Sequence, residues 1–131
     1  MSGRVEYVLD STALIALLSL EPGHQRVEDL LDKAVISAVN LAETVNKLAQ
    51  RASSINVVRD FLMELELVVE DWSEDMAYLS AELAPLSKTH GLSLGDRACL
   101  TLARRLRATA VTSDRQWQRI PSLGIPVLLF R

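Results

Sequence analysis

The stretch that decides the fold class is EYVLDSTALIALLSL, which occupies residues 6–20. Glu6–Leu9 predicts a short strand, because β-branched and aromatic residues lead into a polar break at residues 10–12. Residues 12–20 predict a helix, and Pro22-Gly23 marks the turn that follows it. A strand that passes directly into a helix is the first unit of an alternating pattern.

The same alternation continues along the rest of the sequence. Further strands are predicted at residues 35–37, 65–69, 109–112 and 127–130. One helix is predicted from the turn at Pro22-Gly23 to about residue 33, and another begins at Asn40. Further helices are predicted over residues 54–64, from Ser73 to a weak point near Pro85, from Ser93 to Leu106, and as a short turn after residues 113–114. The expected fold class is α/β, with a central, mostly parallel sheet flanked by helices on both faces. At 131 residues the chain fits one domain, residues 1–131.

Composition excludes several kinds of site. The single cysteine, Cys99, excludes an intrachain disulfide and any zinc or iron–sulfur site built from several cysteines. His24 and His90 lie too far apart in the sequence to give a metal-ligand spacing. The longest unbroken apolar run near the start, Ala13–Leu18, is too short for a membrane span. We therefore expect a soluble, cytoplasmic protein with no membrane contact.

Charge is distributed unevenly along the chain, although the formal net charge is only -3. Residues 1–87 hold 15 acidic and 6 basic residues, whereas residues 88–131 hold 8 basic residues and two acids, Asp96 and Asp114. The basic segment is either a solvated face or a surface that binds a polyanion.

Four acids stand at the starts of predicted helices. Asp10 and Asp114 follow directly on two strands, and the carboxyl ends of parallel strands form the edge where ligands bind. Glu43 and Asp96 each lie three residues after a capping residue, one turn into a helix. Helix starts can point into the same crevice, so the four side chains are predicted to form one carboxylate cluster.

Each acid also has a purely structural explanation. Asp10 and Asp114 could cap the helices that follow them, and the other two could close capping boxes with Asn40 and Ser93. A cluster of four carboxylates repels itself unless a cation occupies it, and Mg²⁺ or Mn²⁺ is the natural occupant of an all-oxygen site. Such a site can hydrolyse phosphoesters without a histidine or cysteine base, because the metal activates the water.

Residues beside the acids are secondary candidates. The hydroxyl residues that could orient a carboxylate or a water, or serve only as turn and cap residues, are Ser11, Thr12, Thr112 and Ser113. Arg97 and Arg115 directly follow two of the acids and could contact phosphate. Cys99 is predicted to lie in the core, and packing is favoured over base stacking for Trp72 and Trp117. The helix at residues 57–65 is either core or an apolar patch for a partner.

The sequence resembles the PIN domains, and in length and motif order it resembles the VapC toxins of toxin–antitoxin pairs. The resemblance covers essentially the whole chain and rests on four acidic motifs in order: Asp10-Ser11-Thr12-Ala13-Leu14, Val39-Asn40-Leu41-Ala42-Glu43, Leu92-Ser93-Leu94-Gly95-Asp96 and Thr112-Ser113-Asp114-Arg115. Arg97 departs from the pattern, because family members often carry a small residue after this aspartate.

The resemblance implies a PIN-like fold and a metal-dependent endoribonuclease. Asp10, Glu43, Asp96 and Asp114 would match the catalytic acidic quartet, holding one or two Mg²⁺ or Mn²⁺ ions, and Thr112 the hydroxyl residue that supports it. VapC toxins typically cut structured RNA, often tRNA or rRNA, and form homodimers. A cognate VapB-like antitoxin is expected to wrap the toxin with its C-terminal tail and block the acidic groove.

Two other classes of protein are alternatives to the enzyme. A PIN-like binding or scaffolding module without turnover would have no need of four converging carboxylates. A phosphoacceptor signalling domain would place adjacent acids after the first strand and a lysine late in the chain, but Leu9 precedes Asp10 and no lysine follows Lys88.

Overall fold

The computed structural model describes residues 4–51 and 54–131, and its strands and helices alternate as the sequence predicts. The strands are β1 (Tyr7–Leu9), β2 (Ala34–Ser37), β3 (Val68–Glu70), β4 (Thr109–Thr112) and β5 (Val127–Leu129). The α-helices are α1 (Ser11–Ser19), α2 (His24–Leu30), α3 (Ala38–Gln50), α4 (Ile55–Leu65), α5 (Glu74–Ser80), α6 (Ala84–His90) and α7 (Leu94–Leu106). Three 3₁₀ turns complete the description: η1 (Leu31–Lys33), η2 (Ala81–Leu83) and η3 (Arg115–Arg119).

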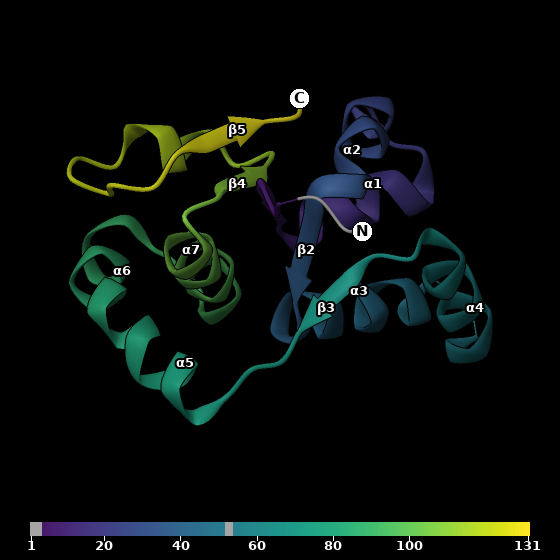
Figure 1. Cartoon of the computed structure of the whole chain (residues 1–131), viewed down its shortest axis with the longest axis horizontal. Coiled ribbons are helices and arrows are strands. Elements are labelled where there is room, and N and C mark those ends of the chain that lie inside the picture. Colours follow the sequence, from purple (N-terminus) through teal and green to yellow (C-terminus); the bar gives the residue numbers. More distant parts are fainter. Residues whose placement is uncertain (1–3, 52–53) are drawn as a thin grey trace.

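The five strands form one parallel sheet in the order β3-β2-β1-β4-β5 (Figure 1). The central strand β1 pairs with both of its neighbours in register, so that Leu9 lies beside Ile36 of β2 and Val111 of β4. The carboxyl ends of these three strands therefore meet at one edge of the sheet. The α/β class and the parallel sheet are confirmed.

Alternate residues of the strands supply two separate cores, one on each face of the sheet. Val8 and its neighbours pack against α5, α7 and the segment around Trp117. Leu9, Ile36 and Val111 pack against α1 and α2 on the opposite face. The two groups of helices lie on opposite sides of the sheet in Figure 1. This period-two burial is what a central strand needs when helices cover both of its faces.

Several predicted boundaries differ from the structure, and three of the differences have a clear local cause. The helix predicted from Asn40 begins at Ala38, because the side chain of Ser37 accepts a hydrogen bond from Val39 N and caps it. The strand predicted from Leu65 begins at Val68, since α4 continues through Leu65. The helix predicted from Ser73 ends at Ser80, and η2 leads directly into α6. Pro85 lies in the first turn of α6, where a residue without an N–H is tolerated.

Side chains assigned to packing are buried. Cys99 and Trp117 lie in the core, and Trp72 packs against it. α4 is different, because it buries Val58 but exposes Phe61 and Met63, so the apolar-patch interpretation applies to this helix. Within the described ranges, no helix is long and apolar enough to cross a membrane.

Candidate active site

Asp10 stands at the carboxyl end of β1 and is only 4% exposed. It is the N-cap of α1, because its Oδ1 accepts a hydrogen bond from Ala13 N at 3.0 Å. It also accepts hydrogen bonds from two hydroxyls, Thr12 Oγ1 to Oδ1 and Thr112 Oγ1 to Oδ2, both at 2.6 Å. The capping role and the site role are therefore compatible. The hydroxyl beside Asp10 that bonds to it belongs to Thr12, whereas Ser11 is buried in the first turn of α1.

Burial controls the protonation of Asp10. The pKa of its carboxyl is raised from 3.8 to about 6, mainly by loss of hydration and to a smaller extent by the carboxylate of Asp96. The hydrogen bonds from Thr112, Thr12 and Ala13 act in the opposite direction, because they favour the charged form. The site thus contains a buried acid that a neighbouring positive charge would stabilise.

The two threonines connect Asp10 to the segment that carries the fourth acid. Thr12 Oγ1 accepts from Ser113 N at 3.2 Å, and Thr112 Oγ1 accepts from Asp114 N at 3.0 Å. Each hydroxyl therefore donates to Asp10 and accepts from the backbone after β4. The side chain of Asp114 is exposed and caps η3, with Oδ1 accepting from Gln116 N at 2.9 Å.

Glu43 lies on α3 and faces the start of α7. Asn40 Nδ2 donates to Glu43 Oε1 at 3.0 Å and to the carbonyl oxygen of Gly95 at 3.1 Å. The capping box predicted between Asn40 and Glu43 is wrong, because both residues lie inside α3 and Ser37 is its cap. A Cβ atom at residue 95 would collide with both carboxylate oxygens of Glu43. Glycine at this position is what allows α7 to approach that carboxylate.

Asp96 forms the predicted capping box at the start of α7. Its Oδ2 accepts from Ser93 N at 2.9 Å, and its own N–H donates to Ser93 Oγ at 3.1 Å. This arrangement fixes the carboxylate beside the helix N-terminus. As for Asp10, the same side chain is a cap and a member of the acidic group.

Three of the four acids lie on elements that pack together near the buried thiol of Cys99. Burial raises the pKa of the Cys99 thiol, and the carboxylates of Asp10, Asp96 and Glu43 raise it further, so all three lie within electrostatic reach of that sulfur. They come from β1, α7 and α3. The backbone N–H of Asp114 donates to Thr112, while its carboxylate is exposed and caps η3. We call these four carboxylates the acidic site.

The donor set fits a hard divalent cation. Between described residues, no hydrogen bond ends on Glu43 Oε2, Asp96 Oδ1 or Asp114 Oδ2, so these oxygens are available to a ligand. Carboxylate oxygens are the ligands that Mg²⁺ and Mn²⁺ prefer. In the side-chain positions seen, no three histidine, cysteine, aspartate or glutamate residues within the described ranges form a metal-binding group.

The two candidate arginines have different surroundings. Arg115 is exposed in η3, directly after Asp114. Arg97 is partly buried, and its Nε is buried without a hydrogen-bond partner among the described residues. Of the other arginines of the basic segment, Arg104 pairs with Glu82 at 3.5 Å on the surface.

A family model of the PIN domain matches residues 7–123, which include all four acids of the acidic site. The chain belongs to the PIN domain family. Among curated proteins, no sequence match was found. The PIN domain fold is also similar to several solved structures, most of them of toxin–antitoxin complexes.

Three of these structures illustrate the likeness. The first is VapBC2 from Rickettsia felis bound to a DNA fragment from its promoter, with 20% identity, a TM-score of 0.71, and coverage of 95% of this chain and 98% of that one. DNA-bound VapBC from Salmonella typhimurium has 18% identity, a TM-score of 0.73, and coverage of 97% and 99%. FitAcB from Neisseria gonorrhoeae has 23% identity, a TM-score of 0.69, and coverage of 93% and 96%. At these identities the likeness establishes the fold.

Two residues of the site are not identified by the sequence pattern. Asn40 has the pattern of a helix cap, and Gly95 is part of a motif without a predicted role. Both act across the gap between α3 and α7, 55 residues apart in the chain. The available signal was local: a glycine and an asparagine, each close to an acid, at positions where helices favour neither residue.

Proposed function

We propose that this PIN domain is a metal-dependent endoribonuclease, the VapC-like toxin of a toxin–antitoxin pair, which hydrolyses phosphodiester bonds of structured RNA such as tRNA or rRNA. The proposal is supported by the placement of Asp10, Glu43 and Asp96 on elements that pack together near the start of α7, with Asp114 following Thr112, whose hydroxyl donates to Asp10. Neighbouring carboxylates repel one another, and a bound cation would offset that repulsion.

Asp10, Glu43, Asp96 and Asp114 would hold Mg²⁺ or Mn²⁺ through oxygen atoms. When bound, the metal would acidify a water that attacks phosphorus and would stabilise the charge that develops on the phosphate oxygens. Thr112 and Thr12 hold the buried Asp10 carboxylate in place and favour its ionised form.

RNA would be contacted by the basic C-terminal third of the chain. Arg115 stands exposed beside Asp114, and Arg97 follows Asp96 directly. We propose that both guanidinium groups bind backbone phosphates, because arginine carries several N–H donors that match phosphate oxygens. Ser113, between Thr112 and Asp114, is proposed to support the same segment.

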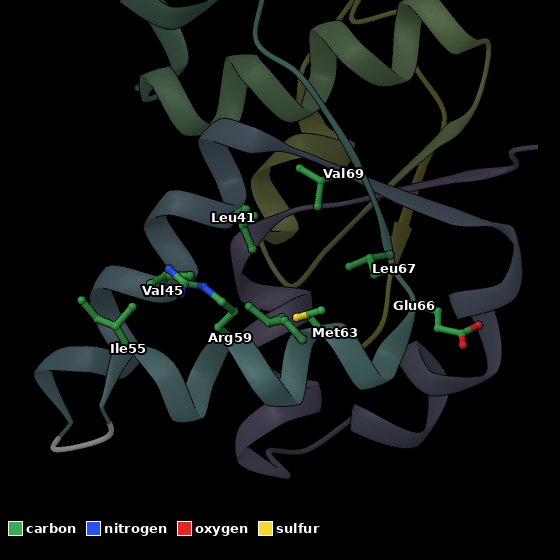
Figure 2. Close-up of a pocket in the computed structure, with 9 residues that line it drawn as sticks. Leu41, Val45, Ile55, Arg59, Met63, Glu66, Leu67 and Val69 are labelled. Carbon is green, nitrogen blue, oxygen red and sulfur yellow. The ribbon is translucent and has the colours of Figure 1, made fainter.

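We propose that the protein acts in the cytoplasm as a homodimer and is inhibited by a VapB-like antitoxin. An apolar hollow of about 460 Å³ between α3, α4 and β3 is the surface proposed to bind the antitoxin (Figure 2). Its wall includes Leu41, Val45 and Met63, and Met63 is 71% exposed. A Met63→Glu substitution is expected to weaken copurification of the antitoxin while RNA cleavage remains intact, because the hollow is lined by residues outside the acidic site.

The deciding experiment is cleavage of total cellular RNA by the purified protein, with Mn²⁺ and with EDTA. The matched variant is Asp96→Asn, because its amide oxygen can still accept the capping bond from Ser93 N while the charge is removed. Discrete fragments that require Mn²⁺ and disappear in the variant would support the ribonuclease. Equal cleavage by folded Asp96→Asn would remove Asp96 from the site, and no cleavage by antitoxin-free wild type would favour a binding module.

A further inference from the structure

Asn40 is a buried amide at the point where α3 meets the start of α7. It is 1% exposed, and its Nδ2 donates hydrogen bonds to Glu43 Oε1 and to the carbonyl oxygen of Gly95. The first bond holds a carboxylate of the acidic site, and the second ties the two helices together. Helix capping does not explain this residue, because Ser37 caps α3.

The orientation of the Asn40 amide is determined by its two acceptors. Turning the amide over would place Oδ1 against the oxygens of Glu43 and Gly95, neither of which can donate a hydrogen. In the orientation seen, Oδ1 is buried and has no hydrogen-bond partner among the described residues. A buried polar atom left without a partner lowers the stability of the folded protein. The amide therefore donates to Glu43 and Gly95 while its own oxygen is left without a hydrogen bond, which lowers the stability of the fold.

Gly95 restrains the same carboxylate from the other side. Its Cα lies so close to Glu43 that a Cβ atom would collide with both Oε atoms. Glu43 is thus held between the Asn40 amide and bare backbone. The donor is also neutral, so the full negative charge of the carboxylate remains available, whereas a lysine or arginine at residue 40 would compete with a bound cation.

We propose that Asn40 is a positioning residue of the acidic site, which fixes the Glu43 carboxylate for divalent cation binding without neutralising it. This inference rests on the proposed metal-dependent function. Hydrogen-bond partners of metal ligands typically contribute 10–100-fold to metal affinity, because they orient the ligand before the metal arrives. Asn40 would act through Glu43 and touch neither the cation nor the RNA.

The test is the Mn²⁺ dissociation constant of the purified protein, measured by electron paramagnetic resonance without RNA. Asn40→Ala is expected to weaken Mn²⁺ binding about 10-fold. Asn46→Ala is the matched control and is expected to bind as wild type, because Asn46 lies on the same helix but its exposed amide bonds only to the carbonyl oxygen of Ala42. Asn40→Leu, which keeps the branched shape of the side chain but removes its polar atoms, replaces Asn40→Ala if the alanine variant does not fold.

A double-mutant cycle separates positioning from a general structural effect. In a Glu43→Ala background, Asn40→Ala is expected to cause no further loss of Mn²⁺ affinity, because its only route to the cation is already removed. An undiminished loss in that background, or wild-type affinity of the folded Asn40 variants, overturns the inference while the proposed function stands. Absence of Mn²⁺ binding by the wild type overturns the proposed function itself.

Discussion

Replacing Asp10 by asparagine is expected to stabilise the metal-free protein at neutral pH. Asp10 is buried, and its only cationic compensation would be a bound metal, so in metal-free buffer its charge opposes folding. Asparagine has nearly the same shape and carries no charge. The substitution therefore isolates the cost of keeping a carboxylate at the end of β1.

The magnitude follows from the pKa of Asp10, which burial raises from 3.8 to about 6. The native state holds the Asp10 proton more tightly than the unfolded chain does. The contribution of Asp10 to the free energy of unfolding therefore falls as the pH rises from 3.8 to about 6, and it is constant above that range. The full penalty at neutral pH is about 3 kcal/mol. Asparagine keeps an acceptor for Thr12 but turns an N–H toward Thr112, which costs about 1 kcal/mol. The expected net gain is about 2 kcal/mol.

Urea denaturation in EDTA at pH 7.5 and pH 4.0 measures this gain. The difference between Asp10→Asn and wild type should be about 2 kcal/mol at pH 7.5 and should fall below about 1 kcal/mol at pH 4.0, where the native carboxyl is protonated. Asp60→Asn, on the exposed surface of α4, is the control and should change little at either pH. If Asp10→Asn is no more stable than wild type at pH 7.5, then burial does not destabilise the charged form and the reasoning fails.

Three further substitutions probe the rest of the acidic site. Gly95→Ala should displace the Glu43 carboxylate and reduce RNA cleavage at least 10-fold, while urea denaturation changes by less than about 1 kcal/mol because only the end of a flexible side chain must move. Thr112→Val should lower the free energy of unfolding by about 1–3 kcal/mol, because it removes a buried hydrogen bond to Asp10. Since that bond favours the ionised form of Asp10, its loss should also move the rising limb of the cleavage pH profile to higher pH. Thr112→Ser, which keeps the hydroxyl, should restore the profile. Arg115→Ala should weaken RNA binding and reduce the slope of affinity against salt concentration. An unchanged slope would mean that Arg115 is a solvated surface residue that does not contact phosphate.

Local hydrogen bonding explains why the sequence predicts the caps formed by three of the acids. The capping box of Ser93 and Asp96, the cap formed by Asp114 and the polar break at Asp10 each involve residues no more than three apart. Such contacts are nearly independent of the rest of the fold, so a short window of sequence contains all the information. Helix boundaries that depend on competing caps, such as Ser37 against Asn40, were predicted less well.

What the sequence determined by itself was the alternation of strands and helices, the alternate burial within each strand, and the acids placed at element starts. Tertiary structure decided which of them meet. Asp10 and Thr112 share a hydrogen bond across 102 residues because β1 and β4 are adjacent and parallel, and Asn40 reaches Gly95 because α3 crosses the start of α7. These contacts depend on strand order and helix packing, which the whole chain selects by burying both faces of one sheet at once.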